Sequence, residues 1–203
     1  MHTNLTADLI NKIDWTKCNE LVPTIIQNVK TLEVLMLGFM NKEAIILTQE
    51  TGNIHFFSRT KNRIWMKGEE SGNILKMHEM KLDCDNDTIL ALVSPVGNTC
   101  HLETKSCFNA DTNFLSKLES IIAERTAKED GDSYISKLIS HGINKVAQKV
   151  GEEGVEVAIA VINESNELLL EESADLIFHL IIALNLRGLS IFDTIDILKN
   201  RNK

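Results

Sequence analysis

The sequence predicts two domains of different class: a strand-rich α+β domain over residues 1–110 and an all-α helical bundle over residues 111–203. Before Phe108, short extended apolar runs alternate with turns that contain Gly, Pro or Asn, which is typical of strands. After Phe108, apolar residues recur with a period near 3.6 and no proline appears, which is typical of helices. A chain of 203 residues that is 43% hydrophobic is long enough for two small domains.

Extended apolar runs and a single helix account for the first half. Asn41 is a suitable N-cap for a helix over residues 42–50, and Gly52 ends that helix. Pro95 and Gly97 interrupt the last extended run. A single helix among short strands predicts an α+β arrangement. The predicted strands are residues 24–30, 33–39, 53–58, 63–66, 74–82 and 88–94.

Helical periods account for the second half. Asn113, Ser133 and Ser190 are suitable N-caps, and Gly188 is a suitable C-cap. Such a series of helices joined by short connections predicts a bundle. The predicted helices are residues 114–127, 134–140, 143–163, 168–186 and 191–200.

The composition narrows the class of protein. The net charge is −8 and the pI is about 5.3, so the basic footprint of a nucleic-acid binder is missing and no nucleic-acid partner is expected. The apolar run 168–186 contains Glu171, Asp175 and His179, which favours a buried helix over a membrane span. Four cysteines are too few for a disulfide scaffold, and no signal peptide is evident. We therefore expect a cytoplasmic protein.

The segment DCDND at residues 83–87 carries the strongest chemical signal. Asp83, Asp85 and Asp87 alternate in a predicted turn between strands, so their side chains can face one way and bind Mg²⁺. Cys84 lies between them, and sulfur suits Zn²⁺. Together with Cys100 and Cys107 it would leave a fourth tetrahedral position for a water whose pKa falls towards about 7. A structural zinc site remains the alternative.

Polar residues near these thiols are candidates for proton transfer and substrate binding. His101 follows Cys100 directly and is a candidate general base or water-orienting group, although an isolated histidine is usually structural. Gly68 and Gly72 bracket a tight loop that offers backbone N–H groups, a lysine and a hydroxyl to a phosphate. A solvated turn is the alternative for this loop. The predicted substrate-binding residues of this half are Arg59, Trp65, Lys67, Glu69 and Ser71.

Two pairs of acids fall inside the helical half. Glu153 and Glu156 are three residues apart, as are Glu172 and Asp175, so each pair lies on one face of its helix. Apolar neighbours indicate that these faces meet another helix, where carboxylates need cations between them. A Mg²⁺ site is therefore expected, with a solvated acidic face as the alternative. Lys145 and Lys149 precede the first pair and are positioned to meet a polyphosphate, and Glu152 either joins the metal site or acts as the base.

These motifs resemble two enzyme families of histidine biosynthesis. The first half is similar to phosphoribosyl-AMP cyclohydrolases through EVLML at 33–37, Met40-Asn41, Ser58-Arg59, WMKGEESG at 65–72, DCDND at 83–87, Cys100-His101 and SCF at 106–108. The second half is similar to phosphoribosyl-ATP pyrophosphatases through AER at 123–125, SY at 133–134, QKVGEE at 148–153, Glu156 and ESADL at 172–176. The fused chain thus resembles the bifunctional family that carries both activities, over almost its whole length.

The resemblance implies an order of reactions. The C-terminal domain would hydrolyse phosphoribosyl-ATP to phosphoribosyl-AMP and pyrophosphate, and the N-terminal domain would then add water across N1–C6 of the adenine ring. The family's zinc site is assembled from two subunits, so a homodimer is implied. His101 would handle protons on the zinc side, and the helical acids would hold the Mg²⁺ that activates water at the α–β bond.

The sequence departs from the family's pattern at a few positions. Asn86 stands where Gly is common, and asparagine tolerates the left-handed backbone that such a turn needs. Leu102 and Glu103 replace a usual Thr-Gly, and Ile135 replaces a usual Thr after Ser133-Tyr134. Two other classes compete with the bifunctional enzyme: a general nucleotide pyrophosphatase with a structural zinc module, and a non-enzymatic metal-binding module. The second leaves the helical carboxylates unexplained.

Overall fold

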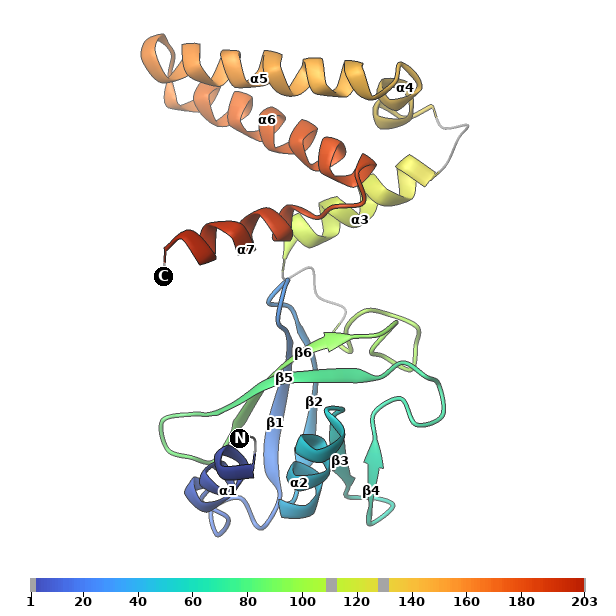
Figure 1. Ribbon diagram of the computed structural model, residues 1–203, viewed down its shortest axis with the longest axis vertical. Coiled ribbons are helices and arrows are strands. Elements are labelled where there is room, and N and C mark those ends of the chain that lie inside the picture. Colours follow the sequence, from blue (N-terminus) through green and yellow to red (C-terminus); the bar gives the residue numbers. More distant parts are fainter. Residues whose placement is uncertain (1–2, 109–112, 128–131, 203) are drawn as a thin grey trace. The chain divides into compact units, whose positions relative to one another are not determined.

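The computed structural model describes residues 3–108, 113–127 and 132–202 of the chain, with side chains from Asp8 onward (Figure 1). The chain forms two compact units, residues 1–113 and 114–203. The first is strand-rich and the second contains only helices among its described residues, so the predicted fold class is confirmed. The predicted boundary between residues 110 and 111 lies outside the described residues.

The N-terminal unit contains two sheets. The larger has the strand order β2-β1-β6-β5, in which β1 and β6 run parallel and the other neighbours antiparallel, and the smaller pairs β3 with β4. The strands follow the predicted runs within two residues at either end. The elements are α1 (Thr3–Lys12), β1 (Val22–Asn28), β2 (Val34–Met40), α2 (Lys42–Thr51), β3 (His55–Ser58), β4 (Arg63–Met66), β5 (Leu75–Leu82) and β6 (Ile89–Pro95).

One apolar core joins both sheets and α2. Its most buried members come from β1, β2, α2, β3 and β6 and include Ile26, Met40, Ile45, Phe56 and Ile89. Gly38 on β2 allows the close approach of β3, because a Cβ atom there would lie 2.3 Å from the Phe56 ring. The β3–β4 hairpin, which leads into the candidate substrate loop, is thereby anchored on the large sheet.

Local capping explains where α2 begins and ends. The Asn41 side chain accepts the Ala44 N–H at 2.9 Å, and Gly52 adopts a left-handed φ of 71° with its N–H on the Thr48 carbonyl. Both predicted caps are therefore confirmed. Helix α1 was not predicted; it is ten residues long, and its few apolar residues stand in a mostly polar N-terminal stretch.

The C-terminal unit consists of α3 (Phe114–Ala127), α4 (Tyr134–Ser140), α5 (Ile143–Asn163), α6 (Asn166–Leu186) and α7 (Ile191–Arg201). Helices α5 and α6 form a long hairpin and lie side by side (Figure 1). Ser133 and Ser190 cap their helices as predicted, whereas α6 begins two residues early because Ser165 caps it. Gly188, at φ 69°, follows the C-cap residue Arg187.

The core of this unit is assembled near one end of the hairpin. Ile122, Ile135, Val146, Ile181 and Ile182 form its buried centre. Ile135 is 1% exposed, so the isoleucine that stands in place of the family's threonine fills the core. Among the described residues no single helix is long and apolar enough to cross a bilayer; α6 and α7 pass that test only as a pair bent by 102°.

Candidate functional site

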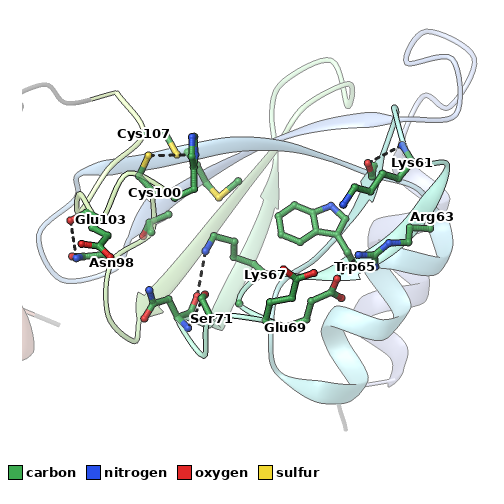
Figure 2. A pocket seen from close by; sticks show the side chains of 17 residues that line it. Lys61, Arg63, Trp65, Lys67, Glu69, Ser71, Asn98, Cys100, Glu103 and Cys107 are labelled. Atoms are coloured by element: carbon green, nitrogen blue, oxygen red, sulfur yellow. Dashed lines mark hydrogen bonds and ion pairs between the residues drawn. The ribbon is translucent and has the colours of Figure 1, made fainter.

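A cavity of about 600 Å³ opens in the N-terminal unit beside β4, the loop that follows β4 and the loop that follows β6 (Figure 2). Arg59 is not part of its lining, because the Arg59 guanidinium lies 3.8 Å from the centroid of the Phe39 ring. The cavity brings together the other predicted substrate residues of this half and two of the three predicted zinc ligands. These are Trp65, Lys67, Glu69, Ser71, Cys100 and Cys107, and the predicted proton-transfer residue His101 also lines the cavity.

The loop after β4 is held in a defined shape. Gly68 has φ 89°, and a Cβ atom there would lie 2.5 Å from the Asn73 backbone, so the loop requires glycine. Arg63 Nη2 lies 2.5 Å from Glu69 Oε1, and the Met66 N–H donates to Glu69 Oε2 at 3.2 Å. Glu69 therefore braces the loop from within. Its carboxylate is already paired and forms part of the cavity wall.

Lys67 directs its ammonium group into this cavity. The Nζ atom donates to the Asn73 carbonyl at 3.3 Å, and burial lowers the pKa of Lys67. Figure 2 shows its side chain between the loop after β4 and the thiol-bearing segment. A partly desolvated cation with a single neutral partner is available for an anionic group of a ligand.

The two thiols of the cavity have different acidities. Hydrogen bonds from the Leu102 backbone, from Thr104 and from the Cys107 thiol hold the pKa of Cys100 below its ordinary value. Burial and the neighbouring Cys100 raise the pKa of Cys107. His101 Nδ1 lies 3.9 Å from Cys100 Sγ. Two thiols and an imidazole are donor groups that suit Zn²⁺.

Cys84 lies away from this pair. It is exposed in the turn between β5 and β6, next to the register pair Leu82–Ile89, whereas Cys100 follows the opposite end of the same hairpin, beyond the pair Leu75–Pro95. Seven residues of strand separate the two ends by about 23 Å. The three predicted zinc ligands therefore do not meet within one chain.

The three aspartates of the turn converge. Ligand atoms of Asp83, Asp85 and Asp87 lie within 4.8 Å of one another, as the alternation of these residues predicts. Asp83 Oδ1 accepts the N–H groups of Asp87 at 3.0 Å and Thr88, and Asn86 adopts φ 61°. The tolerance of asparagine for left-handed backbone is thereby confirmed at this turn.

A lysine pairs with two members of this acidic group. Lys17 Nζ forms ion pairs with both Asp85 and Asp87. The hydrogen bond from Lys17 lowers the pKa of Asp87, and the same contacts raise the pKa of Lys17. Lys17 was not predicted as part of this site, because it lies 68 residues earlier and no spacing motif links it to the turn.

A second acidic group lies between α5 and α6. Ligand atoms of Glu153, Glu156 and Glu172 lie within 4.8 Å of one another, and Glu153 is only 3% exposed. A hydrogen bond with Glu153 raises the pKa of Glu156. Asp175 lies three residues further along α6, is exposed and is not part of this group of three. Carboxylates crowded between two packed helices, one of these carboxylates buried, favour a bound cation.

Lysines on the preceding turns neutralise part of this charge. Lys149 Nζ lies 2.7 Å from Glu153 Oε1 and 3.1 Å from Glu152 Oε2. These bonds raise the pKa of Lys149 and lower the pKa of both glutamates. Lys145 Nζ contacts Gln148 Oε1 at 3.2 Å, and Gln148 in turn donates to Glu152. The charged face therefore combines predicted acids with both predicted lysines.

Two further side chains complete the helical site and were not predicted. His179, 4% exposed, lies with Nδ1 3.5 Å from Glu153 Oε1, and Tyr134 contacts His179 Nε2 at 2.8 Å. His179 follows Asp175 by four residues on α6, and this spacing, which places both on one helix face, is the sequence signal that could have identified His179.

Comparison with protein families accounts for both units. The family model described as phosphoribosyl-AMP cyclohydrolase matches residues 36–109, and the one described as phosphoribosyl-ATP pyrophosphohydrolase matches residues 115–202. The two matches fall in the order that the motifs predict.

Curated relatives match the chain from end to end. The chain is 51% identical to the Histidine biosynthesis bifunctional protein HisIE of Campylobacter jejuni, over 97% of each chain. It is 46% identical to the protein of that name from Xanthomonas campestris, over 99% of this chain and 98% of the relative. The relative from Buchnera aphidicola is 49% identical, over 97% of this chain and 92% of its own length.

Proposed function

This chain belongs to the family of bifunctional histidine-biosynthesis proteins, and we propose from that premise how its two units divide the work. The chain is a hydrolase with two activities. Its C-terminal unit hydrolyses phosphoribosyl-ATP to phosphoribosyl-AMP and pyrophosphate, and its N-terminal unit opens the adenine ring of phosphoribosyl-AMP with water. The order of the units along the chain is the reverse of the order of the reactions. The observation that carries this function is the match of both family models in this arrangement.

In the C-terminal unit, Glu153, Glu156 and Glu172 are the proposed Mg²⁺ ligands, with Asp175 available at the exposed edge. When bound, Mg²⁺ neutralises phosphate charge and promotes attack by water at the α–β bond. Lys149 and Lys145 lie on the same face and bind the phosphates that the metal leaves uncompensated. Glu152 is the proposed general base, because it lies beside Lys149 but outside the group of three ligands.

In the N-terminal unit, Cys100 and Cys107 are proposed to hold Zn²⁺ in the wall of the cavity, with Cys84 as the third ligand. When bound, Zn²⁺ lowers the pKa of a coordinated water towards about 7. His101 lies next to Cys100 and receives or returns a proton at the ring. Lys67, Ser71 and Trp65 line the space in which the nucleotide binds. Asp83, Asp85 and Asp87 form a separate Mg²⁺ site.

Two observations support a homodimer as the working form. Cys84 lies at the opposite end of the β5–β6 hairpin from Cys100, so a second copy must supply it to complete three thiolate ligands. Independently, α5 and α6 expose apolar side chains, including Val155 at 59%, Ile162 at 79% and Leu170 at 70%. Such an apolar face on a helix pair is typical of an interface. Free thiols as zinc ligands also fit a reducing, cytoplasmic setting.

The function is tested by incubating the protein with phosphoribosyl-ATP and Mg²⁺ and measuring pyrophosphate release and ring opening by absorbance. Cys100→Ser is expected to abolish ring opening and retain pyrophosphate release, whereas Glu156→Gln is expected to abolish pyrophosphate release. With phosphoribosyl-AMP as substrate, Glu156→Gln should open the ring as the unmodified protein does. Accumulation of phosphoribosyl-AMP by the unmodified, zinc-loaded protein would overturn the cyclohydrolase assignment.

A further inference from the structure

His179 is a buried histidine to which the proposed reaction gives no task. It lies on α6, 4% exposed, against the equally buried Glu153 of α5. Its Nδ1 atom lies 2.9 Å from the Asp175 carbonyl oxygen and 3.5 Å from Glu153 Oε1, and its Nε2 atom lies 2.8 Å from the Tyr134 hydroxyl. Both ring nitrogens are therefore in contact with named polar atoms.

These partners select one tautomer of the imidazole. The Asp175 carbonyl and the Glu153 carboxylate are both acceptors, so the ring must carry its hydrogen on Nδ1. The Tyr134 hydroxyl is able to donate, so it satisfies the lone pair on Nε2. The opposite tautomer would place a lone pair against two acceptors inside the unit and leave the buried ring badly paired.

Aromatic contacts hold the ring in this orientation. The Phe178 ring lies 5.4 Å from the His179 ring at an interplanar angle of 80°, and the Tyr134 ring lies 5.9 Å away at 79°. Both are edge contacts of the favourable kind. Tyr134 is the first residue of α4, and Ser133 caps that helix, so the hydroxyl is presented from a fixed helix end. Rotation of the imidazole away from Glu153 would break all of these contacts.

The fixed orientation of the His179 ring constrains the position of the Glu153 carboxylate. Its Oε1 atom faces both Lys149 Nζ, at 2.7 Å, and His179 Nδ1. Lysine is a flexible, rotatable donor, whereas the imidazole is rigid and its direction is set by Tyr134. Glu156 and Glu172 each bring a carboxylate oxygen within 4.8 Å of a Glu153 oxygen.

We propose that His179 is a positioning residue: its Nδ1–H, which is hydrogen-bonded to the Asp175 carbonyl, also faces Glu153 Oε1 at 3.5 Å and so orients this carboxylate for a divalent cation, with Tyr134 setting the tautomer. The inference rests on the proposed Mg²⁺ site. Loss of a residue that orients a metal ligand in this way typically weakens metal binding by about 10- to 100-fold.

The first test compares two replacements that differ in where they present an amide hydrogen. The amide of His179→Asn falls near the position of Nδ1, and that of His179→Gln falls near Nε2. Full-length protein with Asp85→Asn and Asp87→Asn, which removes the competing acidic turn, is titrated with Mn²⁺ by calorimetry. We expect His179→Asn to bind within about 3-fold of this background and His179→Gln to lose about 10-fold or more. Equal affinities for both variants would overturn the positioning role.

Failure of the metal site itself gives a different result. If Glu156→Gln in the same background leaves Mn²⁺ binding unchanged, the proposed Mg²⁺ site is wrong, whatever the His179 variants do. If Glu156→Gln weakens binding and neither His179 variant does, only the positioning role is wrong. The concentration of Mg²⁺ at half-maximal pyrophosphate release provides a second readout. It should rise for His179→Gln while kcat at saturating Mg²⁺ is retained.

Nuclear magnetic resonance tests the tautomer without metal. Long-range ¹H–¹⁵N correlation of the metal-free protein should show the His179 hydrogen on Nδ1, with the signal assigned by its absence in His179→Asn. Tyr134→Phe removes the donor to Nε2 from a half-exposed ring and keeps the ring contacts, so this variant is expected to fold even where a His179 variant does not. It should mix the tautomers and weaken Mn²⁺ binding by a few-fold. An Nε2-bound hydrogen in the unmodified protein would overturn the proposal.

Discussion

The aspartates of the β5–β6 turn come from five consecutive residues and stay largely exposed, whereas the glutamates between α5 and α6 come from two helices and include the buried Glu153. The lysines that pair with these acids differ in the opposite sense, in how far along the chain they lie from the acids. Lys17 reaches the turn from 68 residues away, but Lys149 lies one helical turn before Glu153. The turn is thus a local cluster with a remote partner, and the helical site is a tertiary cluster with a local partner.

The difference has an energetic meaning. Exposed ion pairs contribute about 0–1 kcal/mol, because water and salt screen them. A buried carboxylate that loses its partner carries a desolvation cost that water does not offset. The helical cluster should therefore be coupled to the stability of its unit, whereas the turn should bind or lose its partner with little effect on folding.

The largest expected effect comes from a core substitution that tests whether the two units unfold independently. Gly38→Ala places a Cβ atom against the Phe56 ring and should destabilise the N-terminal unit by about 3 kcal/mol. Both tryptophans, Trp15 and Trp65, belong to this unit, so their fluorescence in a urea titration reports on it. Helical circular dichroism, dominated by the C-terminal unit, should keep its midpoint. Gly151→Ala on α5, where a Cβ atom meets nothing within 4 Å, is the matched control and should not destabilise either unit.

Removal of the lysine of the helical cluster should have the next largest effect. Lys149→Met leaves Glu153 buried without its cation and should lower the free energy of unfolding of the C-terminal unit by about 2 kcal/mol in metal-free buffer at pH 7. Lys149 lowers the pKa of Glu153, so this contribution is present above the ordinary pKa of glutamate and is lost as the pH falls through the lowered value. The two proteins should therefore converge in stability in acid. A constant difference down to acid pH would contradict this account.

Removal of the lysine of the turn should change stability less than removal of Lys149 does, and it should change Mn²⁺ binding. Lys17→Met should cost less than about 1 kcal/mol, since both members of the pair are partly exposed. The same change removes a cation that competes for Asp85 and Asp87, so Mn²⁺ binding at the turn should tighten by about fivefold or less. Binding is measured by calorimetry in a Glu156→Gln background. A loss of stability equal to that of Lys149→Met would remove the distinction between the two clusters.

The smallest expected effect concerns the backbone. Among the described residues, the non-glycine residues with positive φ all belong to the N-terminal unit, whereas the helical unit uses only Gly142 and Gly188 at such positions. Glu103, at φ 59°, stands in the loop between Cys100 and Cys107. Glu103→Gly should stabilise the N-terminal unit by about 0.5 kcal/mol, measured by urea unfolding. Asn62→Gly should gain less, because asparagine tolerates this conformation, and an equal gain would argue against strain at Glu103.

Features that depend on neighbouring residues were predictable from the sequence. The caps at Asn41 and Ser133, the left-handed Asn86 and the convergence of the turn aspartates all follow from a few consecutive side chains. Features that depend on packing between remote segments were not. The contact of Lys17 with the turn spans 68 residues, and the contact of Tyr134 with His179 spans 45.

The cysteines also show that sequence alone does not predict contacts between remote segments. Their residue types predict a common metal, and nothing in their spacing reveals that the β5–β6 hairpin holds Cys84 away from Cys100. Likewise, the spacing of the helical acids predicts a shared face for each pair, but which of the four acids converge depends on how α5 and α6 pack. The convergence includes Glu172 and leaves Asp175 exposed.

The separation of Cys84 from Cys100 along one hairpin also has a genetic consequence. In the proposed homodimer, a chain with Cys84→Ser and a chain with Cys100→Ser would each form only defective ring-opening sites when paired with themselves. In a mixed pair, both lesions fall in the same site and the other site receives two intact contributions. Coexpression of the two defective alleles should therefore restore growth without histidine, with about a quarter of the full complement of ring-opening sites if the chains pair at random.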